Sequence, residues 1–194
     1  MAASPSRLNL PNALTIGRIV LVPLLVVVLL TQFEGRMILG VRKELVGAAI
    51  FALASLTDWL DGYLARRRKQ VTALGQLMDP LADKLLVTAA LVSLVSMGQA
   101  PAWMVAVILG REFAVTVLRA MAHARGHVIA ASPLGKFKMV AQIVAILALI
   151  LGRYHLGPLF VIGIVALWIA TITALISAVD YYRRFNHVIS DAAR

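Results

Sequence analysis

The stretch from residue 58 to residue 83 reads Asp58-x-x-Asp61-Gly62-x-x-Ala65-Arg66, then eight residues, then Gly75-x-x-x-Asp79-x-x-x-Asp83. It holds four of the nine acidic residues in a chain that is otherwise mostly apolar. Asp58 and Asp61 are three residues apart, and Asp79 and Asp83 are four apart, so each pair shares one face of a helix. Two helices joined by the basic run 66–69 would gather four carboxylates. Such a cluster needs cations to stay ionised beside apolar surroundings.

The composition indicates a membrane protein. The 194 residues are 61% hydrophobic, whereas a soluble domain is about 45–50% apolar. We therefore expect an all-α, polytopic membrane protein with six transmembrane helices, preceded by a short N-terminal interfacial segment up to residue 18. The expected helices span residues 19–30, 45–66, 75–97, 102–125, 134–151 and 158–182. No linker rich in Pro, Ser or Gly divides the chain, so we expect a single domain over residues 1–194.

The net charge of +10 bears on partners and orientation. In a soluble protein it would suggest nucleic acid, but here the basic residues lie between apolar runs, and few aromatic residues accompany them. The lipid bilayer, with its anionic cytoplasmic surface, is the better partner, and we expect no nucleic acid. With six spans, most Lys and Arg residues fall on the side of the two termini. This predicts an integral cell-membrane protein whose termini and active site face the cytoplasm.

The expected spans also set the depth of the carboxylates. At about 1.5 Å of rise per residue, an antiparallel pair of helices places Asp58 level with Asp83, and Asp61 close to Asp79. The cluster would lie in the cytoplasmic third of the membrane. Each ionisable group at the centre of a span costs about 2.5–3.5 kcal/mol. Polar contact between helices is the alternative role, but four aspartates at paired helical spacings favour a functional site.

The residue types narrow the cation and its ligand. The chain has no cysteine, and its histidines lie outside the cluster, so an all-oxygen site suits Mg²⁺, Mn²⁺ or Ca²⁺. Three or four carboxylates can hold two divalent ions, an arrangement that suits phosphoryl chemistry. Gly62 and Gly75 would let a ligand approach closely, and the small Ala65 would leave room beside it. Arg66 can bind a phosphate through two hydrogen bonds.

The complete pattern from Asp58 to Asp83 resembles the signature of the CDP-alcohol phosphatidyltransferases. Three other segments look like the branch of this family that uses sn-glycerol 3-phosphate. They are Asn9-Leu10-Pro11-Asn12-x-Leu14-Thr15-x-x-Arg18, Gly110-Arg111-Glu112 and Gly135-Lys136-x-Lys138-x-x-x-Gln142. The resemblance covers nearly the whole chain and implies a six-helix membrane homodimer.

The resemblance also implies roles for the acidic motif. Asp58, Asp61 and Asp79 would be ligands of two Mg²⁺ or Mn²⁺ ions, and Asp83 would be the general base and also touch a metal. The motif's glycines, together with Ala65, would accommodate the cytidine diphosphate of CDP-diacylglycerol, with Arg66 on its phosphates. The hydroxyl of an alcohol would attack the β-phosphorus, and CMP would leave.

An acceptor that carries a phosphate needs a cationic pocket of its own. Arg111, Arg119, Lys136 and Lys138 are the candidates for the phosphate of sn-glycerol 3-phosphate, and Arg18 and Arg125 are weaker ones. The two lysines have an alternative role as cytoplasmic anchors of a span. Arg111 has an alternative role in an ion pair with its neighbour Glu112 or with another helix.

Two other functions stay open on the sequence alone. A sister enzyme would use inositol phosphate, serine or phosphatidylglycerol as its acceptor. A cation transporter would also place aspartates inside the membrane. Transporters more often show broken helices in matched halves of the chain, and this sequence shows no such pattern.

Overall fold

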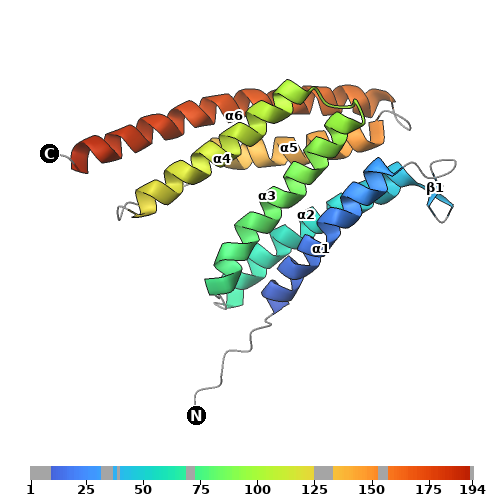
Figure 1. Ribbon diagram of the computed structural model, residues 1–194, viewed down its shortest axis with the longest axis horizontal. Helices are drawn as coiled ribbons and strands as arrows, with labels where there is room; N and C mark the ends of the chain where they lie inside the picture. Colours follow the sequence, from blue (N-terminus) through green and yellow to red (C-terminus); the bar gives the residue numbers. More distant parts are fainter. Residues whose placement is uncertain are drawn as a thin grey trace, which may run out of the picture. The chain divides into compact units, whose positions relative to one another are not determined.

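A computed structural model describes the backbone of residues 10–31, 37–38, 40–68, 73–124, 133–152 and 157–192. Side chains are described for residues 15–31, 37–38, 40–57, 81–124, 135, 137–152, 157–183 and 185–186. The described chain contains six helices and one two-stranded hairpin (Figure 1). The all-α class expected from the sequence is therefore confirmed. The contacts divide the chain into two compact units, Met1–Met97 and Gly98–Arg194, each of which is described by itself.

The first unit contains α1 (Leu10–Leu30), α2 (Lys43–Arg68) and α3 (Ala73–Ser96). Helix α1 packs against both α2 and α3, and α2 also contacts α3. Their fully buried side chains include Leu25, Leu29, Phe51 and Leu86, which form an apolar core between the helices. Burial of each such side chain stabilises the unit by about 1.5–3 kcal/mol relative to leaving it exposed.

A short hairpin joins α1 to α2. Strand β1 (Met37–Ile38) pairs antiparallel with β2 (Val41–Arg42), and Gly40 between them has a φ of 78°, a conformation that glycine adopts without strain. Lys43 follows directly, and its Nζ donates to the backbone oxygens of Leu29 and Thr31 at 2.9 and 3.0 Å. A cation at these carbonyls complements the C-terminal end of α1.

Helix α1 begins earlier than the sequence suggested. The apolar run was expected to start at residue 19 after an interfacial segment, but the helix starts at Leu10. Thr15 and Arg18 lie on this earlier part, and each is only 1% exposed. These two polar side chains are therefore buried within the chain. Residues 1–9 lie outside the described part of the chain.

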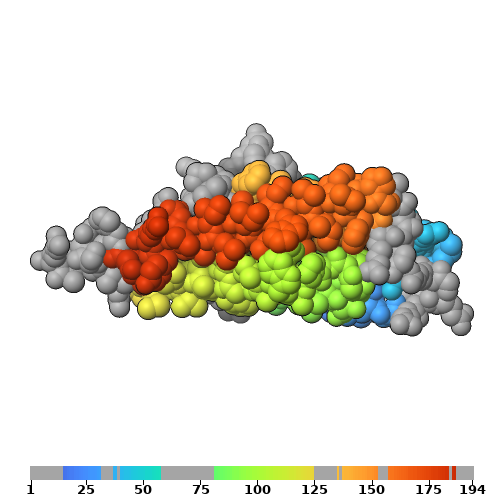
Figure 2. All heavy atoms as spheres, turned by 90° about the horizontal axis from the view of Figure 1, so that it is seen from above, coloured from blue at the N-terminus to red at the C-terminus, as the bar shows by residue number. Residues whose placement is uncertain are grey.

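The second unit contains α4 (Ala102–Ala124), α5 (Pro133–Gly152) and α6 (Gly157–Ala192). Helix α6 packs against α4 and α5, and Figure 2 shows it lying along α4. The two helices run parallel, because Trp103 meets Trp168 with ring centroids 5.4 Å apart while Arg111, further along α4, meets Ser177 on α6. Helix α6 continues ten residues beyond the expected end at Tyr182.

Helix α6 is suited to a bilayer. Its segment Gly157–Arg183 is, among the described residues, the helix long and apolar enough to cross a membrane by length and composition. Thr15–Leu30 and Phe137–Gly152 form shorter apolar helices. One face of α6 exposes large apolar side chains over most of this segment, namely Val161, Ile162, Val165, Trp168, Ile169, Ile172, Leu175, Ile176 and Val179. So long an exposed apolar stripe is typical of a surface that contacts lipid or another chain.

Candidate active site

Helices α2 and α3 carry the acidic motif around the connection between them. Asp58 precedes the last residue of α2 by ten positions (68 − 58), and Asp83 follows the first residue of α3 by ten (83 − 73). Asp61 and Asp79 are seven and six residues from the same connection (68 − 61 and 79 − 73). Equal numbers of residues mean equal helical rise. By this count, Asp58 lies level with Asp83 along the helices, and Asp61 lies close to the level of Asp79, as the sequence predicts.

Most of the motif's side chains lie outside the described part of the chain. This applies to all predicted motif residues between 58 and 80, namely Asp58, Asp61, Gly62, Ala65, Arg66, Gly75 and Asp79. Asp83 is described and is partly buried on α3. For the other seven motif residues, the predicted contacts with metal and CDP-diacylglycerol fall outside the described side chains.

Arg18 lies close in space to the turn that begins the motif. Its Nε donates to the backbone oxygen of Ala54 at 3.2 Å. Ala54 lies one helical turn before Asp58 on α2, so this bond ties α1 to the turn that leads into the first aspartate. The Arg18 side chain is 1% exposed, so this bond is a buried contact between α1 and α2.

The donor set decides which metal the motif would fit. Among the residues with described side chains, no three His, Asp or Glu side chains gather into a group that would hold a metal; three of the four motif aspartates lie outside that set. The motif itself supplies four carboxylates on two helices of one unit, at matching numbers of residues from the connection between the helices. Carboxylate oxygens suit Mg²⁺ or Mn²⁺, so the residues fit the predicted ions.

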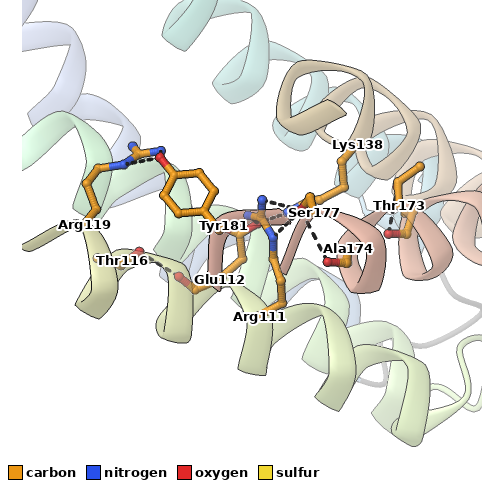
Figure 3. A network of polar contacts seen from close by, with 10 residues as sticks. Arg111, Glu112, Thr116, Arg119, Lys138, Thr173, Ala174, Ser177 and Tyr181 are labelled. Atoms are coloured by element: carbon orange, nitrogen blue, oxygen red, sulfur yellow. Dashed lines mark hydrogen bonds and ion pairs between the residues drawn. The ribbon is translucent and has the colours of Figure 1, made fainter. Parts of the chain in front are cut away.

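A second polar site lies inside the other unit, between α4, α5 and α6 (Figure 3). Arg111 donates from Nε and Nη2 to Ser177 Oγ at 2.9 and 2.6 Å. Its Nη1 lies 3.2 Å from Glu112 Oε1. The Nζ of Lys138, on α5, pairs with the same oxygen of Glu112. One carboxylate therefore faces two cations, and Arg111, Glu112, Lys138 and Ser177 form what we call the cation cluster.

Arg119 lies two turns further along α4 and binds a different part of α6. It donates from Nε and Nη2 to Tyr181 Oη at 3.2 and 2.8 Å. The guanidinium carbon is 5.4 Å from the centre of the Tyr181 ring, within the range of a cation–π contact. Tyr181 is 1% exposed, so its ring and hydroxyl fix the side chain of Arg119.

Three of the four residues predicted for the acceptor lie in the second unit with described side chains, two on α4 and one on α5. Arg111 and Lys138 share Glu112, and Arg119 lies two turns away on the same helix. The side chain of Lys136 and the whole of Arg125 lie outside the described residues. The ion pair of Arg111 with Glu112, considered as an alternative to phosphate binding, is confirmed. The cluster also contains Lys138, a second cation on the same carboxylate.

Sequence reasoning missed Ser177 and Tyr181. Both lie on α6 and provide the oxygens that hold Arg111 and Arg119. They are four residues apart and share one face of an otherwise apolar helix. This spacing is the signal that would have indicated a polar partner on a neighbouring helix.

Comparison with known proteins identifies the family. The model of the CDP-alcohol phosphatidyltransferase family matches residues 8–176. This range includes the acidic motif and the helices α4 and α5, which carry the cations of the cluster. The chain belongs to this family. The match runs through both units, and the chain is a phosphatidyltransferase enzyme.

Individual relatives are similar over nearly their whole length. The CDP-diacylglycerol–glycerol-3-phosphate 3-phosphatidyltransferase of Bacillus subtilis (strain 168) is 46% identical, over 91% of this chain and 94% of that protein. The protein of the same name from Rickettsia typhi is 37% identical, over 90% of this chain and 96% of the relative. A probable phosphatidylglycerophosphate synthase of Mycobacterium tuberculosis (strain H37Rv) is 43% identical, over 91% of this chain and 81% of the relative.

Proposed function

We propose that this enzyme transfers the phosphatidyl group of CDP-diacylglycerol to sn-glycerol 3-phosphate and releases CMP. The observation that carries the proposal is the 46% identity, over nine-tenths of the chain, to a relative named for this reaction. The cation cluster supports it from the structure, since a phosphorylated acceptor needs buried positive charge.

The acidic motif would hold the donor. Asp58, Asp61 and Asp79 are the proposed ligands of two Mg²⁺ or Mn²⁺ ions, with Asp83 also near a metal. When bound, the ions would neutralise the diphosphate and stabilise charge on the leaving phosphate. Gly62, Ala65 and Gly75 would leave room for the cytidine diphosphate, and Arg66 would donate to its phosphates.

The transfer itself needs one proton acceptor. The acceptor's hydroxyl oxygen forms a bond to the β-phosphorus, which carries the diacylglycerol, and the bond from that phosphorus to the oxygen of CMP breaks. The hydroxyl proton passes to the carboxylate of Asp83, our proposed general base. Its partly buried position on α3, level with Asp58 by helical rise, supports this role.

The cation cluster would hold the phosphate of the acceptor. Arg111 and Lys138 supply the charge, and Ser177 and Glu112 fix their positions. Arg119 and Lys136 are the further proposed contacts, Arg119 being held in place by Tyr181. Charge-assisted hydrogen bonds to phosphate are about twice as strong as neutral ones, so few contacts suffice.

The proposal includes a location and an assembly. We place the enzyme in the cell membrane with six spans, both termini and the active site facing the cytoplasm, as a homodimer within the lipid bilayer. The apolar stripe of α6 supports contact with lipid. The excess of Lys and Arg on the terminal side of the spans supports the orientation.

The test is release of CMP from CDP-diacylglycerol by the purified enzyme in detergent micelles, with each acceptor in turn. We expect release with sn-glycerol 3-phosphate, and none when EDTA removes divalent ions. Release with inositol phosphate, serine or phosphatidylglycerol instead would assign a sister reaction. No release with any of these acceptors would contradict the proposal.

Asp83→Asn tests the proposed general base in this assay, with Asp180→Asn as its matched control. Loss of a general base typically lowers the rate by about 10²–10⁴-fold, so we expect turnover to fall that far while CDP-diacylglycerol still binds. Asp180→Asn, the same change on α6, should retain turnover. A near-normal rate for Asp83→Asn would remove that residue as the base.

A further inference from the structure

Gln142 on α5 is a buried amide close to the cation cluster. Its side chain is 4% exposed, and its Nε2 has no hydrogen-bond partner within the described part of the chain. It follows Lys138 by one helical turn, so the two side chains share a face of α5 and are offset by about 6 Å along the helix. Lys138 is itself 3% exposed. Both side chains are therefore buried on the same face of α5, one helical turn apart.

A buried amide nitrogen without a partner calls for a reason, because protein interiors leave few such donors unpaired. Gln99, before α4, shows that this property alone does not make a site, since both of its amide atoms are buried and unpaired among the described residues. Gln142 differs in its surroundings. It is one turn from Lys138, whose partner Glu112 also binds Arg111, whereas Gln99 precedes Arg111 by twelve residues.

We infer that Gln142 determines acceptor specificity by donating a hydrogen bond from Nε2 to the hydroxyl of the acceptor that does not react. The inference rests on the proposed function. The acceptor of that reaction has a phosphate, one hydroxyl that becomes phosphatidylated and, between them, the C2 hydroxyl. The cations suit the phosphate, and the C2 hydroxyl is the hydroxyl nearest to it. A neutral amide suits the remaining neutral hydroxyl, next to the phosphate.

The chemistry predicts a specific form of discrimination. A site that is built to hydrogen-bond a substrate hydroxyl rejects an analogue without it, because the buried polar group is then left unpaired. 3-Hydroxypropyl phosphate is that analogue, since it keeps the phosphate and the reacting hydroxyl of sn-glycerol 3-phosphate and lacks only the one at C2. The wild-type enzyme should prefer sn-glycerol 3-phosphate by at least about tenfold in kcat/KM.

The experiment measures CMP release by the full-length enzyme with each of these two acceptors at saturating CDP-diacylglycerol. Gln142→Leu and Gln142→Met remove the amide, and Met keeps the length of the side chain. We expect both variants to reduce the preference to within about threefold, mainly by losing activity with sn-glycerol 3-phosphate. The ratio of two substrates in one preparation does not depend on the fraction of folded enzyme, so loss of stability does not imitate the result.

Gln99→Leu is the matched control, because it makes the same change at a buried amide away from the cluster. It should keep the wild-type preference. The inference is overturned if the wild-type enzyme does not discriminate, if the Gln142 variants keep the full preference, or if Gln99→Leu loses it equally. A wild-type enzyme that uses neither acceptor, but releases CMP with inositol phosphate, serine or phosphatidylglycerol, would instead overturn the proposed function.

Discussion

Glu112 is the residue through which the cation cluster is organised. Its Oε1 lies between Arg111 on its own helix and Lys138 on α5. Removing one partner of such a buried arrangement is costly, because it leaves the other charge uncompensated. Loss of Lys138 differs, since the ion pair between Arg111 and Glu112 stays in place. That makes Lys138 the better residue for a test of phosphate binding.

We expect Lys138→Met to raise the KM for sn-glycerol 3-phosphate about tenfold or more, equivalent to about 1.4 kcal/mol of lost binding. The KM for CDP-diacylglycerol should change less than twofold, because the donor binds to the acidic motif. Steady-state CMP release with each substrate varied in turn measures both values.

Lys43→Met is the matched control for this change. Lys43 is also buried, at 8% exposed, but it caps the C-terminal end of α1 in the other unit. Its loss should lower the melting temperature and leave the KM for the acceptor unchanged. If Lys138→Met raises the KM for the donor instead, the cation cluster does not bind the acceptor.

At the scale of elements, α5 and α6 approach so closely at Gly163 that only glycine fits there. A Cβ on Gly163 of α6 would lie 2.9 Å from the backbone nitrogen of Leu149 on α5, and 2.8 and 2.9 Å from its Cγ and Cδ2. Real Cβ contacts do not reach such distances with backbone. The helix α6, which supplies Ser177 and Tyr181, is therefore placed by this contact.

Gly163→Ala should separate α5 from α6 and lower the free energy of unfolding by about 1–3 kcal/mol, the usual range for overpacking. Thermal unfolding in detergent measures the effect. Gly110→Ala, in α4, is the control, because among the described residues no atom beyond its own helical backbone and chain neighbours lies within 4 Å of the added Cβ. That change should be neutral or stabilise the helix by up to about 1 kcal/mol. Equal melting temperatures for the two variants would show that the α5–α6 contact is not tight.

The ends of the helices show what the sequence leaves undetermined. The apolar runs predicted six helices because periodicity and hydropathy are local properties of the chain. The start of α1 could not be predicted in this way, since Thr15 and Arg18 are polar and typical of an interfacial segment, and only the packing shows that they are buried. The end of α6 could not be predicted either, because Arg183 indicated a stop, although Phe185 beyond it is still buried, at 7% exposed.

The same distinction holds for the site. The aspartates are candidates from the sequence alone, because their spacing and their cost in a membrane mark them within 26 residues. The cations Arg111, Arg119 and Lys138 could be predicted as a group by their sign. Their partners could not, because Ser177 lies 66 residues from Arg111, and no local pattern chooses one hydroxyl among several on α6.

At the scale of the whole molecule, the orientation in the membrane is the expectation with the widest consequences. Six spans with cytoplasmic termini would place the acidic motif where soluble sn-glycerol 3-phosphate can reach it. The structure supplies exposed positions on both expected sides. Val41, Ala102 and Gly157 would lie outside, and Ala124 and Asn186 inside. The chain has no cysteine, so each position can carry a single one.

We expect a membrane-impermeant maleimide to label Val41→Cys, Ala102→Cys and Gly157→Cys in intact bacterial spheroplasts. Ala124→Cys and Asn186→Cys should be labelled only after lysis, because the membrane shields cytoplasmic thiols. The unsubstituted chain, which has no thiol, sets the background. Labelling of Val41→Cys and Ala124→Cys in the same intact sample would contradict an odd number of spans between them. Labelling of the second group alone would keep the spans but invert the enzyme, and would place the motif away from its soluble acceptor.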